Sequence, residues 1–347
     1  FNGIQSGNWN GKQKGQIMSK FADIYGHEQI KEHLQNAIRL NKVSHAYIFN
    51  GPMGSGKKMT AGIFAETLQC EQHGQEPCGT CHSCIQSESG NQPDIIWVHH
   101  EKPGSIGVDD VREQVIGDMQ IKPYSSRYKI YIIDEAEKLT QQAQNALLKT
   151  IEEPPAYGII ILLTTNADTF LQTILSRCVR LDFRPLRDTL VTQYLQEKYD
   201  LTDYECRFAT AFAQGKIGRA VTIATSKEFA QLKEEVMHVI RYAKEMTTAE
   251  IMAEVKNIAN YKLTIDDYLD LMAMWYRDVL VFKSTKDSNA LIFKDEMSLL
   301  AEQAKNCSYE GLEDILKSID KVKLRLKANV NFDLVIELLI MAIKEAM

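Results

Sequence analysis

A glycine-rich loop followed by two lysines is the first group of residues whose types and spacing could do chemistry. Gly51-Pro-Met-Gly54-Ser-Gly56-Lys57-Lys58 follows an apolar run and precedes a helical pattern, which is the context that a phosphate-binding P-loop requires. Glycines let successive backbone N–H groups converge on phosphate oxygens at a helix N-terminus. We predict a phosphate site formed by Gly51, Gly54, Gly56 and Lys57. The alternative is a turn that only joins a strand to a helix.

Lys58 stands where an active P-loop has the Ser or Thr hydroxyl that ligates magnesium. An ammonium group only donates hydrogen bonds and cannot bind a metal cation. Thr60 is no simple replacement, because residues two apart on a helix face different directions. We therefore expect a nucleotide site that is weak or inactive, without an assembled hydrolytic Mg²⁺–ATP site in the same chain.

Two carboxylates follow an apolar run further along the chain. Asp134 and Glu135 come directly after residues 129–133, which is the form of a Walker B strand. In a working site Asp134 would hold magnesium and Glu135 would orient the attacking water. Asn166, after the next apolar run, could add a polar side chain near a γ-phosphate. The alternatives are a buried strand with a solvated acidic end and, for Asn166, an ordinary turn residue.

A single arginine forms a third candidate. Arg177 lies in Ser176-Arg-Cys178, directly after a short helical pattern. At the edge of an α/β domain, an arginine could point into a neighbouring subunit's nucleotide site and stabilise transition-state charge there. The alternative is a solvated surface arginine.

Four of the seven cysteines form a cluster with the spacing C-x7-C-x2-C-x2-C: Cys70, Cys78, Cys81 and Cys84. Four thiolates on short turns can surround one Zn²⁺ ion tetrahedrally, and such a closed site is structural because no coordination position stays open. Redox chemistry and an iron–sulfur cluster are the alternatives. The three isolated cysteines are expected to be core thiols.

The elements that must position these residues follow from the hydrophobic pattern. As far as about Leu186, short β-type runs alternate with helical stretches, which predicts a parallel sheet with helices on both faces. The expected strands are 46–50, 95–99, 129–133, 159–164 and 179–183, and the expected helices between them are 28–40, 57–69, 108–119, 141–151 and 170–175. Every later pattern has helical spacing, so the second half is predicted to be all-α.

Composition limits the partners. The 347 residues include 40 basic and 46 acidic side chains, for a formal net charge of −6, so any contact with DNA must be local rather than a uniform basic coat. The longest apolar runs, 159–163 and 338–343, are shorter than the roughly 20 residues that span a bilayer. We expect no membrane partner.

Together these motifs resemble the bacterial clamp-loader AAA+ subunits of DNA polymerase III. Besides the P-loop, the cysteines and Asp134-Glu135, the resemblance is carried by residues 21–27, 44–49, 145–155 and 176–178. In that family, an α/β domain and a small helical lid form the AAA+ module, and C-terminal helices form a collar that joins the subunits into a pentameric ring. The resemblance implies four segments: a leader (1–17), an AAA+ α/β domain (18–186, with a zinc module at 70–84), a lid (187–246) and a collar (247–347).

Two groups within the family carry both the P-loop region and the cysteine module, the delta-prime and the gamma/tau subunits. Chain length, residues 89–94 and 275–280, and Lys58 favour the delta-prime group, with an active gamma/tau-type ATPase motor as the alternative. This implies a stator in a hetero-pentameric ring with gamma/tau and delta subunits, which lends Arg177 to a neighbouring ATP site while the sliding clamp is loaded on primed DNA. Arg219 sits where the family has a sensor arginine, so residual nucleotide binding stays open; a solvated helix arginine is the alternative.

The resemblance also implies a cytoplasmic, replisome-associated protein. Nothing in the chain resembles polymerase or nuclease chemistry, so DNA-directed DNA polymerase (nucleotidyltransferase) activity would belong to the complex. We expect no intrinsic ATPase activity. The expected cofactor is a structural Zn²⁺ ion, and binding of ATP and Mg²⁺ to this chain itself is doubtful.

Overall fold

The computed structural model describes residues 20–100, 102 and 104–347, which form two compact units. Unit 1 contains the described residues up to Leu201 together with Ala213–Val221, and unit 2 contains Thr202–Phe212 and Thr222–Met347. The predicted leader lies outside the described residues. Residues 187–246, expected as a lid, are shared between the two units, so the lid and collar boundaries stay predictions.

Unit 1 is built on a five-stranded sheet. Its strands are β1 (Ala46–Asn50), β2 (Ile95–Val98), β3 (Lys129–Ile133), β4 (Gly158–Thr164) and β5 (Val179–Asp182). Their order across the sheet is β2-β3-β4-β1-β5, and every pairing is parallel. The predicted parallel α/β fold is therefore confirmed, and each strand ends within one residue of its expected range.

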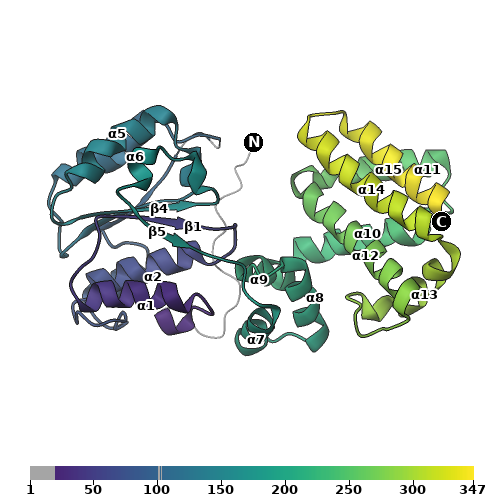
Figure 1. Ribbon diagram of the computed structural model, residues 1–347, viewed down its shortest axis with the longest axis horizontal. Helices are drawn as coiled ribbons and strands as arrows, with labels where there is room; N and C mark the ends of the chain where they lie inside the picture. Colours follow the sequence, from purple (N-terminus) through teal and green to yellow (C-terminus); the bar gives the residue numbers. More distant parts are fainter. Residues whose placement is uncertain (1–19, 101, 103) are drawn as a thin grey trace. The chain divides into compact units, whose positions relative to one another are not determined.

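Helices cover both faces of this sheet. Figure 1 shows α1 and α2 on one side of the strands and α5 and α6 on the other. Successive residues such as Ile132 and Ile133 enter different apolar clusters, one on each face. Because both faces are covered, β3 and β4 are buried along their whole length, and most of their residues are apolar. The four helices are α1 (Glu28–Arg39), α2 (Lys57–Gln69), α5 (Gln141–Glu152) and α6 (Gln172–Leu175).

Between β2 and β3 the structure differs from the prediction. The pattern predicts one helix over 108–119, whereas α4 (Val108–Val111) passes into a π-helical stretch (Arg112–Gly117) and a 3₁₀ turn (Asp118–Gln120). Gly117 fits the wide turn, since a Cβ there would lie 3.2 Å from the carbonyl oxygen of Arg112. A short helix that the pattern does not predict, α3 (His82–Glu88), begins inside the cysteine cluster.

Beyond β5 the described chain is helical, as predicted. Several helices begin at side-chain caps: Ser226, Thr247 and Ser308 each accept a hydrogen bond from a backbone N–H three residues later. Among the described residues, no helix combines the length and the apolar character needed to span a bilayer. The helices are α7 (Asp188–Lys198), α8 (Asp203–Ala213), α9 (Ile217–Thr225), α10 (Lys227–Tyr242), α11 (Thr248–Ile258), α12 (Ile265–Thr285), α13 (Met297–Asn306), α14 (Tyr309–Lys327) and α15 (Phe332–Ala346).

Buried polar bonds on α12 organise unit 2. The indole Nε1 of Trp275 donates to Oε1 of Gln303 on α13 at 2.8 Å, and both side chains are buried. Asp278 is fully buried and accepts the backbone N–H groups of Ile292 and Phe293 at 2.6 and 2.9 Å. Buried carboxylates need such partners, so Asp278 fixes the loop that precedes α13.

Candidate nucleotide site, arginine and cysteine cluster

The P-loop joins β1 to α2 at the carboxyl edge of the sheet. Gly51 lies so close to β5 that a Cβ would be 2.4 Å from the carbonyl oxygen of Phe183. Gly54 has φ +77°, and its carbonyl oxygen accepts the backbone N–H of Gly218 at 2.8 Å. A Cβ on Gly54 would lie 3.0 Å from the backbone nitrogen of Arg219. The start of α9, with Arg219, therefore lies directly against the loop.

Lys57 is folded into the loop. Its Nζ donates to the carbonyl oxygens of Gly51, at 2.5 Å, and of Pro52, at 2.9 Å. The residue is only 9% exposed, and this burial lowers the pKa of its ammonium group. A lysine in this position can bind a phosphate only by exchanging these carbonyl partners for phosphate oxygens.

Lys58 pairs with the first Walker B carboxylate. Its Nζ lies 3.3 Å from Oδ2 of Asp134 and 5.2 Å from the centroid of the Trp97 ring. β2 supplies the tryptophan and the end of β3 supplies the carboxylate. The carboxylate that would hold magnesium thus already has a cation of the chain beside it.

Glu135 is also paired within the chain. Its Oε2 is 2.7 Å from Nζ of Lys138 and 3.6 Å from Nε2 of His100. The residue has a left-handed backbone, with φ +50°, which is uncommon for a side chain other than glycine or asparagine. The Oδ1 of Asn166 accepts the backbone N–H of Asp168 at 3.0 Å. This contact is typical of an ordinary turn residue, the alternative role expected from the sequence.

Arg177 forms an ion pair at the end of α6. Its Nη2 lies 3.0 Å from Oε1 of Glu152, the last residue of α5. Its Nη1 donates to the carbonyl oxygen of Thr173 and to Oγ of Ser176, at 3.0 and 3.2 Å. The side chains of Arg177 and Glu152 are 40% and 43% exposed, so solvent reaches both charges.

The four clustered cysteines converge. Their sulfur atoms all lie within 4.8 Å of one another, and Cys70, Cys81 and Cys84 are buried while Cys78 is half-buried. Zn–S bonds of about 2.3 Å in a tetrahedron put sulfurs about 3.8 Å apart, and the sulfurs of Cys78 and Cys84 are 3.9 Å apart. The donor set therefore fits one tetrahedral metal ion.

Hydrogen bonds within the cluster favour thiolates. The sulfur of Cys70 accepts the backbone N–H of Cys78 at 3.4 Å, and that of Cys81 accepts the N–H of Cys84 at 3.4 Å. Backbone and side-chain hydrogen bonds from Thr80 lower the pKa of Cys78 to about 6. Burial raises the pKa of Cys70 and of Cys84, a cost that a bound cation would offset.

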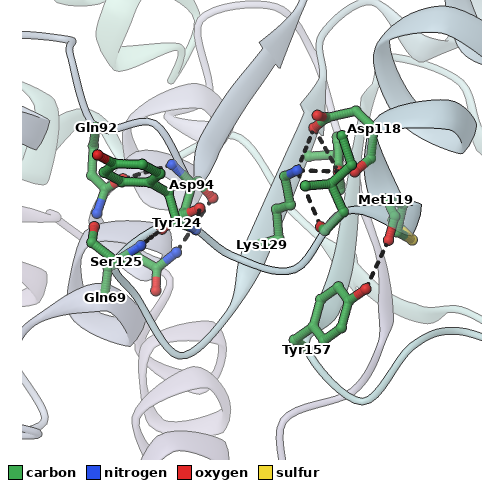
Figure 2. Close-up of polar contacts among 11 residues, drawn as sticks. Gln69, Gln92, Asp94, Asp118, Met119, Tyr124, Ser125, Lys129 and Tyr157 are labelled. Atoms are coloured by element: carbon green, nitrogen blue, oxygen red, sulfur yellow. Dashed lines mark hydrogen bonds and ion pairs between the residues drawn. The ribbon is translucent and has the colours of Figure 1, made fainter.

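A polar network links the helix within the cysteine cluster to the segment that leads into β3. Figure 2 shows four of its members, Gln92, Asp94, Tyr124 and Ser125. The amide of Gln92 donates to Oγ of Ser83, within the cluster's helix α3, and to Oγ of Ser126, at 2.9 and 2.8 Å. Asp94, which is 1% exposed, accepts the backbone N–H groups of residues 124–126 at 2.7 to 3.0 Å. The segment 124–126 leads into β3, so Gln92 and Asp94 fix the approach to the Walker B strand.

Several of these contacts were not foreseen from the sequence. Lys138 could have been found, since it is three residues after Glu135 on a turn. Trp97, His100 and Glu152 meet their partners only through the order of the strands and helices. Residues 89–94, part of the resemblance to clamp-loader subunits, include Gln92 and Asp94, whose hydrogen bonds give this segment a structural role.

The sheet order, the P-loop after β1 and the acidic pair after β3 define a P-loop module of the AAA+ class, followed by helices. The sequence model described as "DNA polymerase III, delta subunit" matches residues 26–187, and the one described as "DNA polymerase III, delta subunit, C terminal" matches residues 227–345. The chain belongs to the clamp-loader subunit family of DNA polymerase III that includes delta-prime, gamma and tau.

Individual relatives come from both groups. The chain is 29% identical to DNA polymerase III subunit delta-prime of Bacillus subtilis, over 90% of this chain and 94% of that protein. It is 30% identical to subunit tau of the same organism, over 88% of this chain but only 58% of tau. A solved DNA polymerase III gamma subunit-related protein from Thermotoga maritima matches with a TM-score of 0.43 and 21% identity, over 90% of this chain and 99% of that one.

Proposed function

We propose that this chain is a delta-prime-type stator of a clamp loader. It hydrolyses no ATP itself and supplies Arg177 to the ATP site of a neighbouring gamma/tau-type subunit. Its partners are gamma/tau-type and delta-type subunits in a hetero-pentameric ring, which loads a sliding clamp on primed DNA during replication. A structural Zn²⁺ ion held by Cys70, Cys78, Cys81 and Cys84 stabilises its α/β domain.

The ion pair between Lys58 and Asp134 carries the first part of this proposal. A hydrolytic P-loop holds magnesium between the hydroxyl at position 58 and the carboxylate at position 134. Here the first ligand is replaced by an ammonium group 3.3 Å from the second. A divalent cation in that place would be repelled by the lysine and would have to displace it. Glu135 is at the same time paired with Lys138, and it would have to exchange this contact in order to orient a water molecule.

The exposure of Arg177 supports the second part. Ion pairs between exposed side chains contribute about 0–1 kcal/mol, so the contact with Glu152 is weak enough to be exchanged. A triphosphate offers a guanidinium a higher charge and bidentate oxygens. An arginine that is held in place and weakly paired suits a role in trans.

An active gamma/tau-type ATPase is the second candidate, favoured by the presence of Lys57, Asp134 and Glu135 and by the 30% identity to tau. Mg²⁺-dependent ATP hydrolysis by the purified chain alone separates the two candidates. The stator predicts no turnover above a chain-free control. Brisk turnover would show that the chain is a motor.

A further inference from the structure

Lys58 occupies the sequence position from which active P-loops ligate their divalent cation, and its ammonium group lies beside Asp134, the carboxylate that follows β3. It contacts Oδ2 of Asp134 at 3.3 Å and the face of Trp97 at 5.2 Å from the ring centroid. Both contacts hold the ammonium group in this place. A positive charge of the chain itself therefore lies beside the P-loop.

The loop itself keeps its anion-binding groups. Within the part of the chain that the structure describes, the backbone N–H groups of Gly56, Lys57 and Lys58 have no acceptor, because α2 begins at Lys57. The Lys57 ammonium adds a second positive charge, held by loop carbonyls. N–H groups at a helix start together with lysines are the chemistry of a polyphosphate site.

A buried hydroxyl in the same loop also lacks a partner. Ser55 is 2% exposed, and its Oγ makes no hydrogen bond with any described residue. Buried hydroxyl groups are normally hydrogen-bonded. The loop therefore has hydrogen-bonding capacity that the described chain does not use.

We propose that this loop binds a polyphosphate, as the phosphate chain of a nucleoside triphosphate or as inorganic tripolyphosphate, without a divalent metal ion. Lys58 supplies the positive charge that magnesium supplies elsewhere. An ammonium has three N–H donors, so Lys58 can keep Asp134 as one partner and bind phosphate oxygens with the others. Binding does not imply hydrolysis, because the magnesium ion that bridges the β- and γ-phosphates in active P-loop enzymes has no part in this site. The inference concerns the isolated chain and does not depend on the stator role.

Titration calorimetry of the full, zinc-loaded chain with ATP and with inorganic tripolyphosphate tests this inference, each in excess magnesium and in magnesium-free buffer that is passed over a chelating resin before the protein is added. We expect binding in magnesium-free buffer, with a dissociation constant within about threefold of that in magnesium, whereas a magnesium-dependent site would bind at least tenfold more weakly there. Binding of either probe in magnesium-free buffer supports the proposal, and the tighter probe identifies the source of the phosphates. No binding at millimolar probe, or a tenfold requirement for magnesium, overturns it.

Variants at position 58 test how much Lys58 contributes to binding, separately from the rest of the loop. Lys58→Met should weaken binding in magnesium-free buffer by about tenfold, because a charge-assisted contact is lost. Lys58→Thr should bind more tightly in magnesium than in magnesium-free buffer, since it restores a metal-ligating hydroxyl. Lys42→Met, at an exposed position away from the loop, is the matched control and should bind like wild type. Unchanged binding by folded Lys58→Met would show that Lys58 has no such role.

Discussion

The guanidinium of Arg177 is paired with the carboxylate of Glu152, with Nη2 and Oε1 3.0 Å apart. The pair joins the end of α6 to the end of α5, two elements on the same face of the sheet (Figure 1). Two further hydrogen bonds, to Thr173 and Ser176, orient the same guanidinium. If Arg177 works on a neighbour's phosphate, that phosphate competes with Glu152 for the guanidinium.

Removal of the Glu152 charge should therefore release the arginine. We expect Glu152→Gln to raise ATP hydrolysis by a ring assembled with gamma/tau-type and delta-type subunits, by up to about fivefold, the equivalent of an exposed ion pair. Steady-state rates at saturating ATP measure this effect. Glu153→Gln, at the adjacent exposed position, is the control. A loss of rate with Glu152→Gln as large as that of Arg177→Ala would show instead that Glu152 presents the arginine.

The Asp94 carboxylate should be a major determinant of stability in unit 1. Asp94→Ala leaves three backbone N–H groups at residues 124–126 without their acceptor, and we expect a loss of about 2–4 kcal/mol in the free energy of unfolding. Asp94→Asn keeps one acceptor oxygen and should lose less. Urea denaturation measures both, with Asp109→Ala at an exposed site as the control. Equal stability of Asp94→Ala and Asp109→Ala would refute the network's importance.

The sequence predicted the sheet because both faces are covered, which makes residues 130–133 of β3 and 159–163 of β4 continuous apolar runs. It also predicted the positions of the P-loop and of Asp134, since carboxyl ends of parallel strands meet at one edge. It did not predict the pairing of Lys58 with Asp134 and Trp97, because that contact depends on strand order and on side-chain conformation. The π-helical stretch Arg112–Gly117 was not predicted, because the spacing of apolar residues does not distinguish a short π-helical stretch from an α-helix.

The cysteine cluster should bind one metal ion per chain. We expect elemental analysis to find one zinc in the wild type and none in Cys81→Ala, and thermal unfolding to show that chelation costs on the order of several kcal/mol of stability. Cys178→Ala removes a cysteine outside the cluster and should keep the metal. Zinc retained by Cys81→Ala, or iron in place of zinc in the wild type, would contradict the assignment.

The stability of unit 1 should depend on pH through Glu66 on α2. Burial, and next the Glu88 charge, raise the pKa of Glu66 from 4.5 to about 7. Because the folded pKa is the higher one, this contribution to stability is fully present below pH 4.5 and is lost as the pH rises through about 7. Glu66→Gln should abolish this loss, so above pH 7 it should be more stable than wild type by on the order of 1–3 kcal/mol. Melting curves of metal-loaded wild type and Glu66→Gln, recorded from below pH 4.5 to above pH 7, measure this effect. The prediction is refuted if the stabilities of the two proteins change equally with pH.

The most direct test of the stator account is DNA-stimulated ATP hydrolysis by the reconstituted ring with Arg177→Ala in place of the wild-type chain. We predict that hydrolysis at the neighbouring site falls by about tenfold or more, since an arginine supplied in trans stabilises transition-state charge. Arg187→Ala, at another exposed position of unit 1, should leave the rate unchanged. An unchanged rate with Arg177→Ala, in a ring that still assembles, would contradict the account.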